Sequence, residues 1–232
     1  MGPDAGAGPL LTVASTRREL GGMARGGAGA TARVVGMGRV AGTQVAALLD
    51  AAPCGLLLSL GYAGALDPRL EPGDLVIGSA FLQGARAPIA STLPTTRAAV
   101  LLRQAGLTVL EGAILTVEEP LLTPQAKHRA HRASGALVAD MEGRWIADAA
   151  AARGVPLIGI RAVLDEARFP LPTFLAAVVA DGGRREWAHA MRAMARPSAV
   201  TKLLPLALKS RWASRSLRLA ARCILREGGL LP

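Results

Sequence analysis

Two segments of the chain place acidic residues directly after stretches that read as buried strands. The first is Val138-Ala139-Asp140-Met141-Glu142-Gly143, and the second is Ile160-Arg161-Ala162-Val163-Leu164-Asp165. Sites in α/β proteins form at the ends of strands. A carboxyl group held there can donate a proton or stabilise positive charge on a ligand. Glu142 and Asp165 are therefore candidates for one site.

Two glycine-rich segments could bring backbone close to a ligand. Gly61-Tyr62-Ala63-Gly64 ends a leucine-rich strand, and its small residues would let the backbone approach a planar ligand. The pattern Gly36-x-Gly38-x-x-x-Gly42 lacks the spacing of a dinucleotide loop, which argues against NAD. It fits a tight turn into a helix whose first amides could face an anion, so Gly38 is a candidate for a phosphate or water site.

The elements that must position these residues alternate between strand and helix, which indicates an α/β layered domain with a largely buried sheet. Apolar runs predict strands at 10–14, 33–35, 55–60, 74–80, 108–117, 138–140 and 155–163. Helices are expected at 43–49, 96–105, 125–133 and 141–153, and loops at 21–32 and 84–96. Residues 1–180 are assigned to this domain and residues 181–232 to a separate basic tail.

The tail carries most of the net charge of +10, with 11 Lys and Arg against 3 Asp and Glu. Pro197 and Pro205 interrupt it, and from Lys209 it reads as an amphipathic helix. One face carries Arg211, Arg215, Arg218, Arg222 and Arg226, and another carries Ala213, Leu217, Ala220 and Ile224. Two readings stay open: the apolar face docks on the body and leaves the arginines in solvent, or the helix meets an anionic membrane surface.

Composition excludes several classes of protein. Hydrophobic residues make up 51% of the 232 residues, enough for a core and too many for a disordered chain. Aromatic residues are only 3%, which argues against a base-stacking nucleic-acid platform. Three His argue against a His-rich metal site, and two distant Cys suit a reducing compartment. With no signal peptide or spanning run, we expect a cytoplasmic protein, peripheral on the inner membrane face if the tail meets lipid.

The segments GYAGALDPRLEPGDLVIGSA, ADMEG and IRAVLDEA together resemble the nucleoside phosphorylase and methylthioadenosine/adenosylhomocysteine nucleosidase superfamily. The resemblance covers residues 58–83 and 135–168 well, and 10–50 loosely. It implies a three-layer αβα domain with a central mixed, twisted sheet, and a homo-oligomer. The implied reaction is cleavage of a purine N-glycosidic bond without a cofactor, with water or inorganic phosphate as the attacking group.

The resemblance also implies roles for individual residues. Asp165 matches the acid that serves N7 of the purine, and Glu142 matches the glutamate that holds the ribose hydroxyls. Glu19 aligns loosely with the glutamate that activates water. The remaining expected substrate contacts are Met141 against the sugar, the backbone of Ala63 and Gly64 against the base, and Tyr62.

A narrower resemblance rests on motifs after Asp165, namely 169–172, 180–183, 196–197 and 203–205. They are similar to the hopanoid-biosynthesis-associated phosphorylases, which implies release of adenine from adenosylhopane. The chain departs from the wider family at Leu164 and Tyr62, where serines are usual, and residues 116–120 lack the aromatic residue that stacks on the base. Two alternatives therefore stay open: a soluble purine nucleoside phosphorylase or methylthioadenosine nucleosidase, and a non-catalytic nucleoside-binding module.

Overall fold

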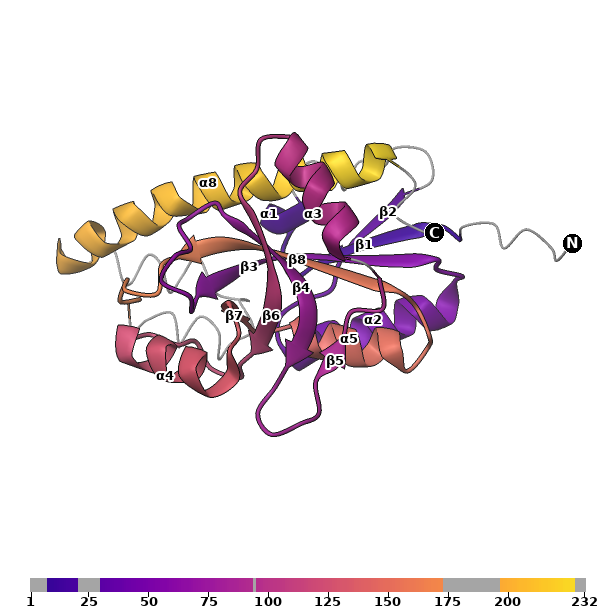
Figure 1. Cartoon of the computed structure of the whole chain (residues 1–232), viewed down its shortest axis with the longest axis horizontal. Helices are drawn as coiled ribbons and strands as arrows, with labels where there is room; N and C mark the ends of the chain where they lie inside the picture. The colour runs from indigo at the N-terminus through magenta and orange to yellow at the C-terminus, as the bar shows by residue number, and fades with distance from the viewer. Residues whose placement is uncertain (1–7, 21–29, 94, 173–196, 228–232) are drawn as a thin grey trace, which may run out of the picture.

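An eight-stranded sheet runs through the centre of the molecule, with helices on both of its faces (Figure 1). The computed structural model describes residues 8–20, 30–93, 95–172 and 197–227. Residues 21–29 of the loop expected at 21–32 and the domain boundary at residue 180 lie outside these ranges, whereas residues 30–32 of that loop form strand instead, since they pair with residues 10–12. The elements are β1 (Leu10–Ala14), α1 (Arg17–Leu20), β2 (Ala30–Val34), α2 (Arg39–Ala51), β3 (Leu56–Ala65), β4 (Leu75–Leu82), β5 (Ile89–Ala90), α3 (Thr95–Gln104), β6 (Val109–Thr116), α4 (Pro124–Ser134), β7 (Val138–Asp140), α5 (Gly143–Ala151), β8 (Leu157–Asp165) and α8 (Pro197–Glu227).

The sheet is mixed, and part of it closes on itself. Strand β3 pairs in parallel with β1 on one side and β8 on the other, and β8 pairs antiparallel with β4. Strand β4 also pairs in parallel with β6, and β6 pairs in parallel with β7. Strand β7 in turn pairs antiparallel with β3 at Gly64 and Ala65. Strands β3, β8, β4, β6 and β7 therefore form a closed ring, and the pairing of β7 with the end of β3 closes it. This mixed α/β architecture confirms the expected fold class.

Each face of the sheet packs against its own set of helices. Leu56, Leu58 and Leu60 of β3 belong to a core shared with α3 and α8, whereas Leu57 belongs to a core shared with α2 and α5. Alternate residues of a strand point to opposite faces, so a strand buried on both sides must be apolar throughout. This is why the leucine-rich run at 56–60 contains no solvent-facing position.

Helix α8 lies across one face of the sheet, along β8 (Figure 1). Its apolar stripe is buried, with Ala213, Leu217, Ala220 and Ile224 in the core, which is the first of the two readings that the sequence left open. The predicted start was wrong, because the helix begins at Pro197 rather than Lys209 and continues through Pro205. A proline is tolerated in the first turn, and the roughly 3 kcal/mol cost of an internal proline is small beside the packing of so long a helix. In the described part of the chain, no helix is both long and apolar enough to cross a bilayer.

Two other predictions are corrected by the sheet. Gly61–Gly64 was expected to end its strand, but β3 continues to Ala65 because it pairs there with β8 and β7. The loop expected at 84–96 contains the short strand β5, which pairs with Ala80 and Phe81. The β3 extension is bonded to strands distant in sequence, whereas β5 forms a short antiparallel hairpin with the end of β4, and neither pairing could be read from local composition.

Candidate active site

The end of β3 presents backbone to the carboxyl group of Asp165. A Cβ atom placed on Gly64 would lie 3.3 Å from Asp165 Oδ2, closer than most side chains tolerate. The register between β3 and β8 shifts at Ala63 and Gly64, which pairs Gly64 with Asp165 itself. The small residue at position 64, which the sequence marked for close approach, therefore lets the backbone of β3 lie next to an acid.

Asp165 is the last residue of β8 and only 2% exposed. Its Oδ2 atom accepts a hydrogen bond from Nζ of Lys127, a buried residue of α4. Burial raises the pKa of Asp165 because it disfavours the charged form, and the positive charge of Lys127 opposes that effect. The net direction is upward, which favours a carboxyl group able to hold a proton.

Glu19 of α1 reaches the same strand end from the other side. Its Oε1 atom accepts a hydrogen bond from the backbone amide of Tyr62 at 3.0 Å. Its Oε2 atom accepts from the amide and the hydroxyl of Thr16, at 2.7 and 2.9 Å. These bonds fix the carboxyl group, while burial raises its pKa. The structure thus brings Glu19, the most weakly supported candidate from the sequence, into direct contact with β3.

Glu142 lies at the start of α5 and is 9% exposed. Its Oε1 atom accepts a hydrogen bond from the amide of Gly38 at 3.0 Å. Burial, and next the negative charge of Asp140, raise the pKa of Glu142 to about 8. Gly38 has a positive φ of 62°, so glycine is suited to this turn. The amide that the sequence suggested for a phosphate or a water is here bonded to Glu142.

A buried ion pair between Arg161 and Asp140 holds together the segments that carry these acids. Nε of Arg161 donates to Oδ2 of Asp140 at 2.6 Å, and both side chains are buried. Asp140 also accepts from the Gly143 amide at 2.9 Å and from the Thr116 hydroxyl at 2.6 Å. The pair therefore joins β8 to the turn between β7 and α5, the turn that carries Glu142.

The contacts bring the residues predicted from the sequence into two neighbouring groups. Glu19, Tyr62, Gly64 and Asp165 lie around the end of β3, and Gly38 contacts Glu142. Glu19 and Glu142 lie near enough for the negative charge of Glu19 to contribute to the raised pKa of Glu142, after burial and Asp140. Ala63 is buried within β3, and Met141 is half-buried beside Glu142. Among the described residues, no group of three or more His, Cys, Asp and Glu side chains is arranged to hold a metal ion.

Sequence reasoning missed Lys127. It lies in PQAKHRAHRAS, a helix with a very polar sequence, where one more basic residue gives no warning of burial. The available signal was its spacing from Ala130 and Ser134, which puts it on the helix face that carries the smaller side chains. That signal does not identify Asp165 as the partner, because the two residues are joined only by the tertiary fold.

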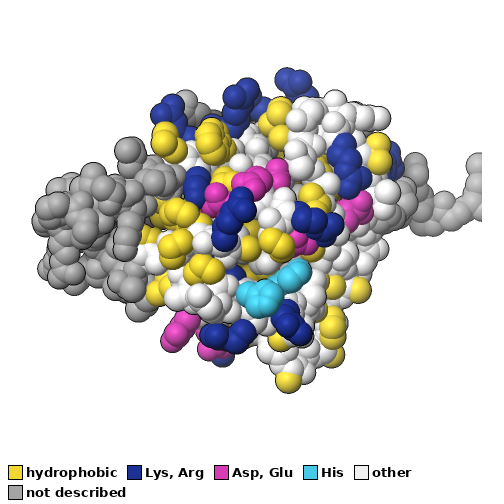
Figure 2. Space-filling model, turned by 60° about the vertical axis from the view of Figure 1, so that its left-hand side comes forward, with side chains coloured by type: hydrophobic (Ala, Val, Ile, Leu, Met, Phe, Trp, Pro, Cys, Tyr) yellow, Lys and Arg dark blue, Asp and Glu magenta, His cyan; other side chains and the backbone are white. Residues whose placement is uncertain are grey.

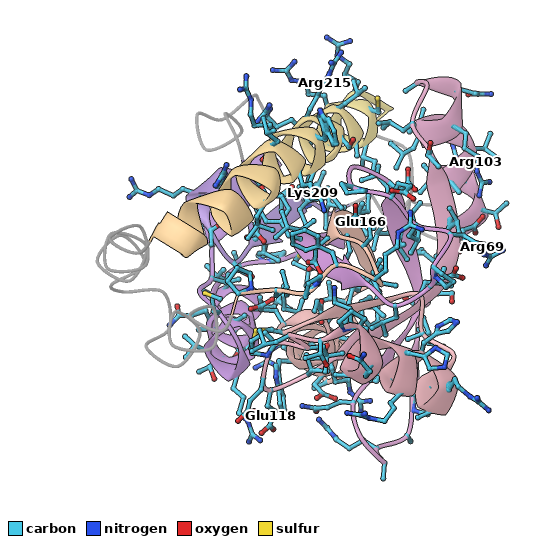
Figure 3. The ribbon with its side chains drawn as sticks, turned by 90° about the vertical axis from the view of Figure 1, so that its left-hand side faces the viewer. Arg69, Arg103, Glu118, Glu166, Lys209 and Arg215 are labelled. Atoms are coloured by element: carbon cyan, nitrogen blue, oxygen red, sulfur yellow. The ribbon has the colours of Figure 1, made fainter. Side chains whose placement is uncertain are left out.

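Helix α8 contacts three of the segments that carry the site. The Tyr62 and Ser214 hydroxyls are 2.6 Å apart, and Arg18 donates to Ser210 Oγ at 2.7 Å. Lys209 pairs with Glu166, the residue after Asp165, at 2.6 Å (Figure 3). The inner face of α8 therefore forms part of the support of the site.

Comparison with known proteins places this arrangement in a family. The family model of the phosphorylase superfamily matches residues 15–196. The 5′-methylthioadenosine/S-adenosylhomocysteine nucleosidase of Helicobacter pylori superposes with a TM-score of 0.69 at 15% identity, covering 97% of this chain and 100% of that one. Futalosine hydrolase of the same organism superposes with a TM-score of 0.67 at 14% identity, covering 93% of this chain and 98% of that one.

A third structure, the S-adenosylhomocysteine nucleosidase of Streptococcus pyogenes, has a TM-score of 0.60 and 20% identity, covering 80% of this chain and 95% of that one. No curated protein sequence gives a significant match. At these identities the structures establish a shared fold, whereas the family model covers most of the chain. The chain therefore belongs to the phosphorylase superfamily.

Proposed function

We propose that the protein hydrolyses the N-glycosidic bond of an adenine nucleoside. The observation that carries the proposal is the closeness of three buried carboxyl groups: Glu19 bonds β3 at Tyr62, Asp165 lies beside Gly64 of the same strand, and Glu142 is near enough to Glu19 to be affected by its charge. Cleavage of this bond needs an acid for the leaving base, a partner for the sugar and an activated nucleophile. The three groups match these needs in number, and the raised pKa of Asp165 suits the acid, whereas Glu19 and Glu142 act in their ionised forms.

In this proposal each group has one role. The base lies against Ala63 and Gly64, and Asp165 donates a proton to its N7 atom while the C1′–N9 bond breaks. Glu142 bonds the ribose hydroxyls and stabilises positive charge on the sugar ring. Glu19 takes the proton of the attacking water. General acid help of this kind contributes roughly 10²–10⁴ in rate.

Water is preferred over phosphate as the nucleophile for two reasons. The Gly38 amide, the best candidate to hold an anion, is bonded to Glu142. A phosphate would also lie beside acids, and in the described residues the positive side chains nearest to them are already paired, Arg161 with Asp140 and Lys127 with Asp165. A neutral nucleophile avoids that repulsion.

The substrate is proposed to be adenosylhopane, an adenosine with a large apolar 5′ substituent. The sequence motifs after Asp165 support this choice, and so does the outer face of α8. Arg211, Arg215 and Arg222 are exposed there, as are Trp212 at 57% and Leu208 at 47%. Figure 2 shows Lys and Arg side chains along the upper edge of the molecule with hydrophobic side chains among them. Such a surface fits the headgroup region of an anionic bilayer, where each cation contributes about 1 kcal/mol.

The first experiment measures adenine release from adenosylhopane in detergent, with and without phosphate, beside methylthioadenosine and adenosine. Phosphate-independent release from adenosylhopane alone is expected. Release only from the soluble nucleosides would support the soluble nucleosidase instead, and a requirement for phosphate would exclude hydrolysis. Release from none of them would favour a non-catalytic binding module.

Variants test the assigned roles. Asp165→Asn and Glu19→Gln should each lower kcat by about 10²–10⁴ because the acid or the base is lost. The matched controls Asp50→Asn and Glu118→Gln change exposed, ion-paired acids and should leave kcat unchanged. An unaltered rate in Asp165→Asn would remove Asp165 from the reaction.

The membrane contact is tested separately with vesicles. Replacing Arg211, Arg215 and Arg222 by Glu should abolish sedimentation with anionic vesicles and leave the weak association with neutral ones unchanged. The control replaces three exposed arginines of α3 and α4, namely Arg97, Arg129 and Arg132, by Glu. Equal binding by both triple variants would show that net charge, and not the face of α8, governs the contact.

A further inference from the structure

Lys127 donates a hydrogen bond to one of the two carboxyl oxygens of Asp165, the proposed acid. The lysine residue is 1% exposed, and its ammonium group donates to three acceptors: Asp165 Oδ2, the Glu166 carbonyl at 2.8 Å and the Phe169 carbonyl at 3.0 Å. An ammonium group has three protons, so all of them are used. The two carbonyl bonds fix Nζ in place independently of the carboxylate.

The same contacts leave the second oxygen of Asp165 for the substrate. In the described part of the chain, Oδ1 of Asp165 accepts no hydrogen bond, and it lies 3.4 Å from the Cβ position of Gly64. Both oxygens lie close to the Gly64 backbone, because Oδ2 is 3.3 Å and Oδ1 is 3.4 Å from that Cβ position. The bond from Lys127 to Oδ2 leaves Oδ1 as the oxygen available to the base.

The charges around Asp165 are few and mostly cancel. Lys127 approaches from α4, Glu166 follows in the chain, and Lys209 approaches from α8 and pairs with Glu166 at 2.6 Å. Lys209 also lies 3.5 Å from the centre of the Phe169 ring. Because Glu166 and Lys209 largely neutralise each other, Lys127 is the cation that balances an ionised Asp165.

We propose, resting on the function proposed above, that Lys127 is the positioning residue of the general acid: it orients Asp165 and keeps its carboxylate form accessible after the proton has left. A buried carboxylate without a partner is strongly disfavoured, so a lone Asp165 would keep its proton and be a poor acid. With Lys127 beside it, Asp165 can lose the proton to N7 as the bond to the sugar breaks and regain one from solvent after the products leave.

The sign of the pH effect follows from this role. The acid works only when protonated, so kcat falls as the pH rises through the pKa of Asp165. Lys127 lowers that pKa, whereas burial raises it. Removing Lys127 leaves burial unopposed and should move the basic limb of the profile to higher pH, while the weaker, less well-oriented acid lowers the plateau.

The test compares kcat against pH for the wild type, Lys127→Met and Lys127→Gln, at saturating adenosylhopane in detergent with adenine release as the readout. We expect the basic limb to move up by about one pH unit or more and the plateau to fall at least about tenfold. Gln can still donate to Oδ2, so it should retain more of the plateau than Met while showing the same shift. The Gln variant carries the test if Met prevents folding.

Lys209→Met is the graded control, because it removes a nearby positive charge without touching Asp165, and its limb should move less. A basic limb that stays at the wild-type pH in both Lys127 variants would overturn the proposal, since a purely structural lysine lowers the plateau without moving the limb. No adenine release by the wild type at any pH would overturn the proposed function itself, and the role of Lys127 with it.

Discussion

At the scale of single residues, the site is a set of acids kept partly neutral by burial. Glu142 has a pKa of about 8 in the folded protein against an ordinary value of 4.5, with burial as the largest cause. Between these two values the folded state binds more protons than the unfolded state. Stability that this proton supplies is therefore lost as the pH rises from about 5 to about 8.

Glu142→Gln removes this titration while keeping the shape of the side chain. The variant should be more stable than the wild type at pH 8, with the difference shrinking toward pH 5, where Glu142 is protonated in the folded protein. Thermal unfolding across this range measures the effect, expected to be several degrees at the alkaline end. Parallel curves for the two proteins would contradict the raised pKa.

The pair of Arg161 and Asp140 gives a second prediction at this scale. Both side chains are buried and their closest atoms are 2.6 Å apart. Arg161→Leu leaves a buried carboxylate without its cation, which costs about 3–5 kcal/mol in the free energy of unfolding. Urea unfolding measures the loss, and adding Asp140→Asn should recover part of it. A double variant less stable than Arg161→Leu would show that Asp140 works mainly through its other hydrogen bonds.

At the scale of elements, α8 is a structural layer of the domain as well as a basic surface. Within this helix, Leu217 is fully buried against the sheet and Leu219 is 37% exposed. Leu217→Ala should lower the free energy of unfolding by about 2–5 kcal/mol through the cavity it leaves. Leu219→Ala, the same change two positions later, should cost less than about 0.5 kcal/mol. Equal losses would mean that α8 is not seated on the sheet in solution.

Elements that rest on local pattern could be predicted from the sequence. The buried strand at 10–14, the helix around 125–133 and the carboxylates after β7 and β8 follow from apolar runs and their ends. The start of α8 was missed because Pro197 and Pro205 indicate an interrupted helix, and the extension of β3 through Gly64 could not be predicted, because distant strands stabilise it. Lys127 belongs to the same class, since only the packing of α4 against the segment after β8 makes it a buried residue.

At the scale of the whole molecule, the closed ring of strands determines where the site can be. Strand β7 bonds to β3 only at Gly64 and Ala65, and this short pairing closes the ring beside Asp165. Glu19 comes from α1 on one face of the sheet, whereas Lys127 and Glu142 come from α4 and the start of α5 on the other face (Figure 1). A site assembled from so many separate segments depends on the complete fold, and no fragment of the chain contains it.

The polar bonds between α8 and the body join the last helix to α1, to β3 and to the segment after β8. Local opening of α8 must break all three, so the helix and the site form one cooperative unit for hydrogen exchange. Backbone amides at 16–19, 60–64 and 165–169 should exchange at rates that follow those of α8, more slowly than amides of the outer strand β2. The seating of the C-terminal helix then becomes a condition for an assembled site, and loss of that helix would be detected first as lost protection around Asp165.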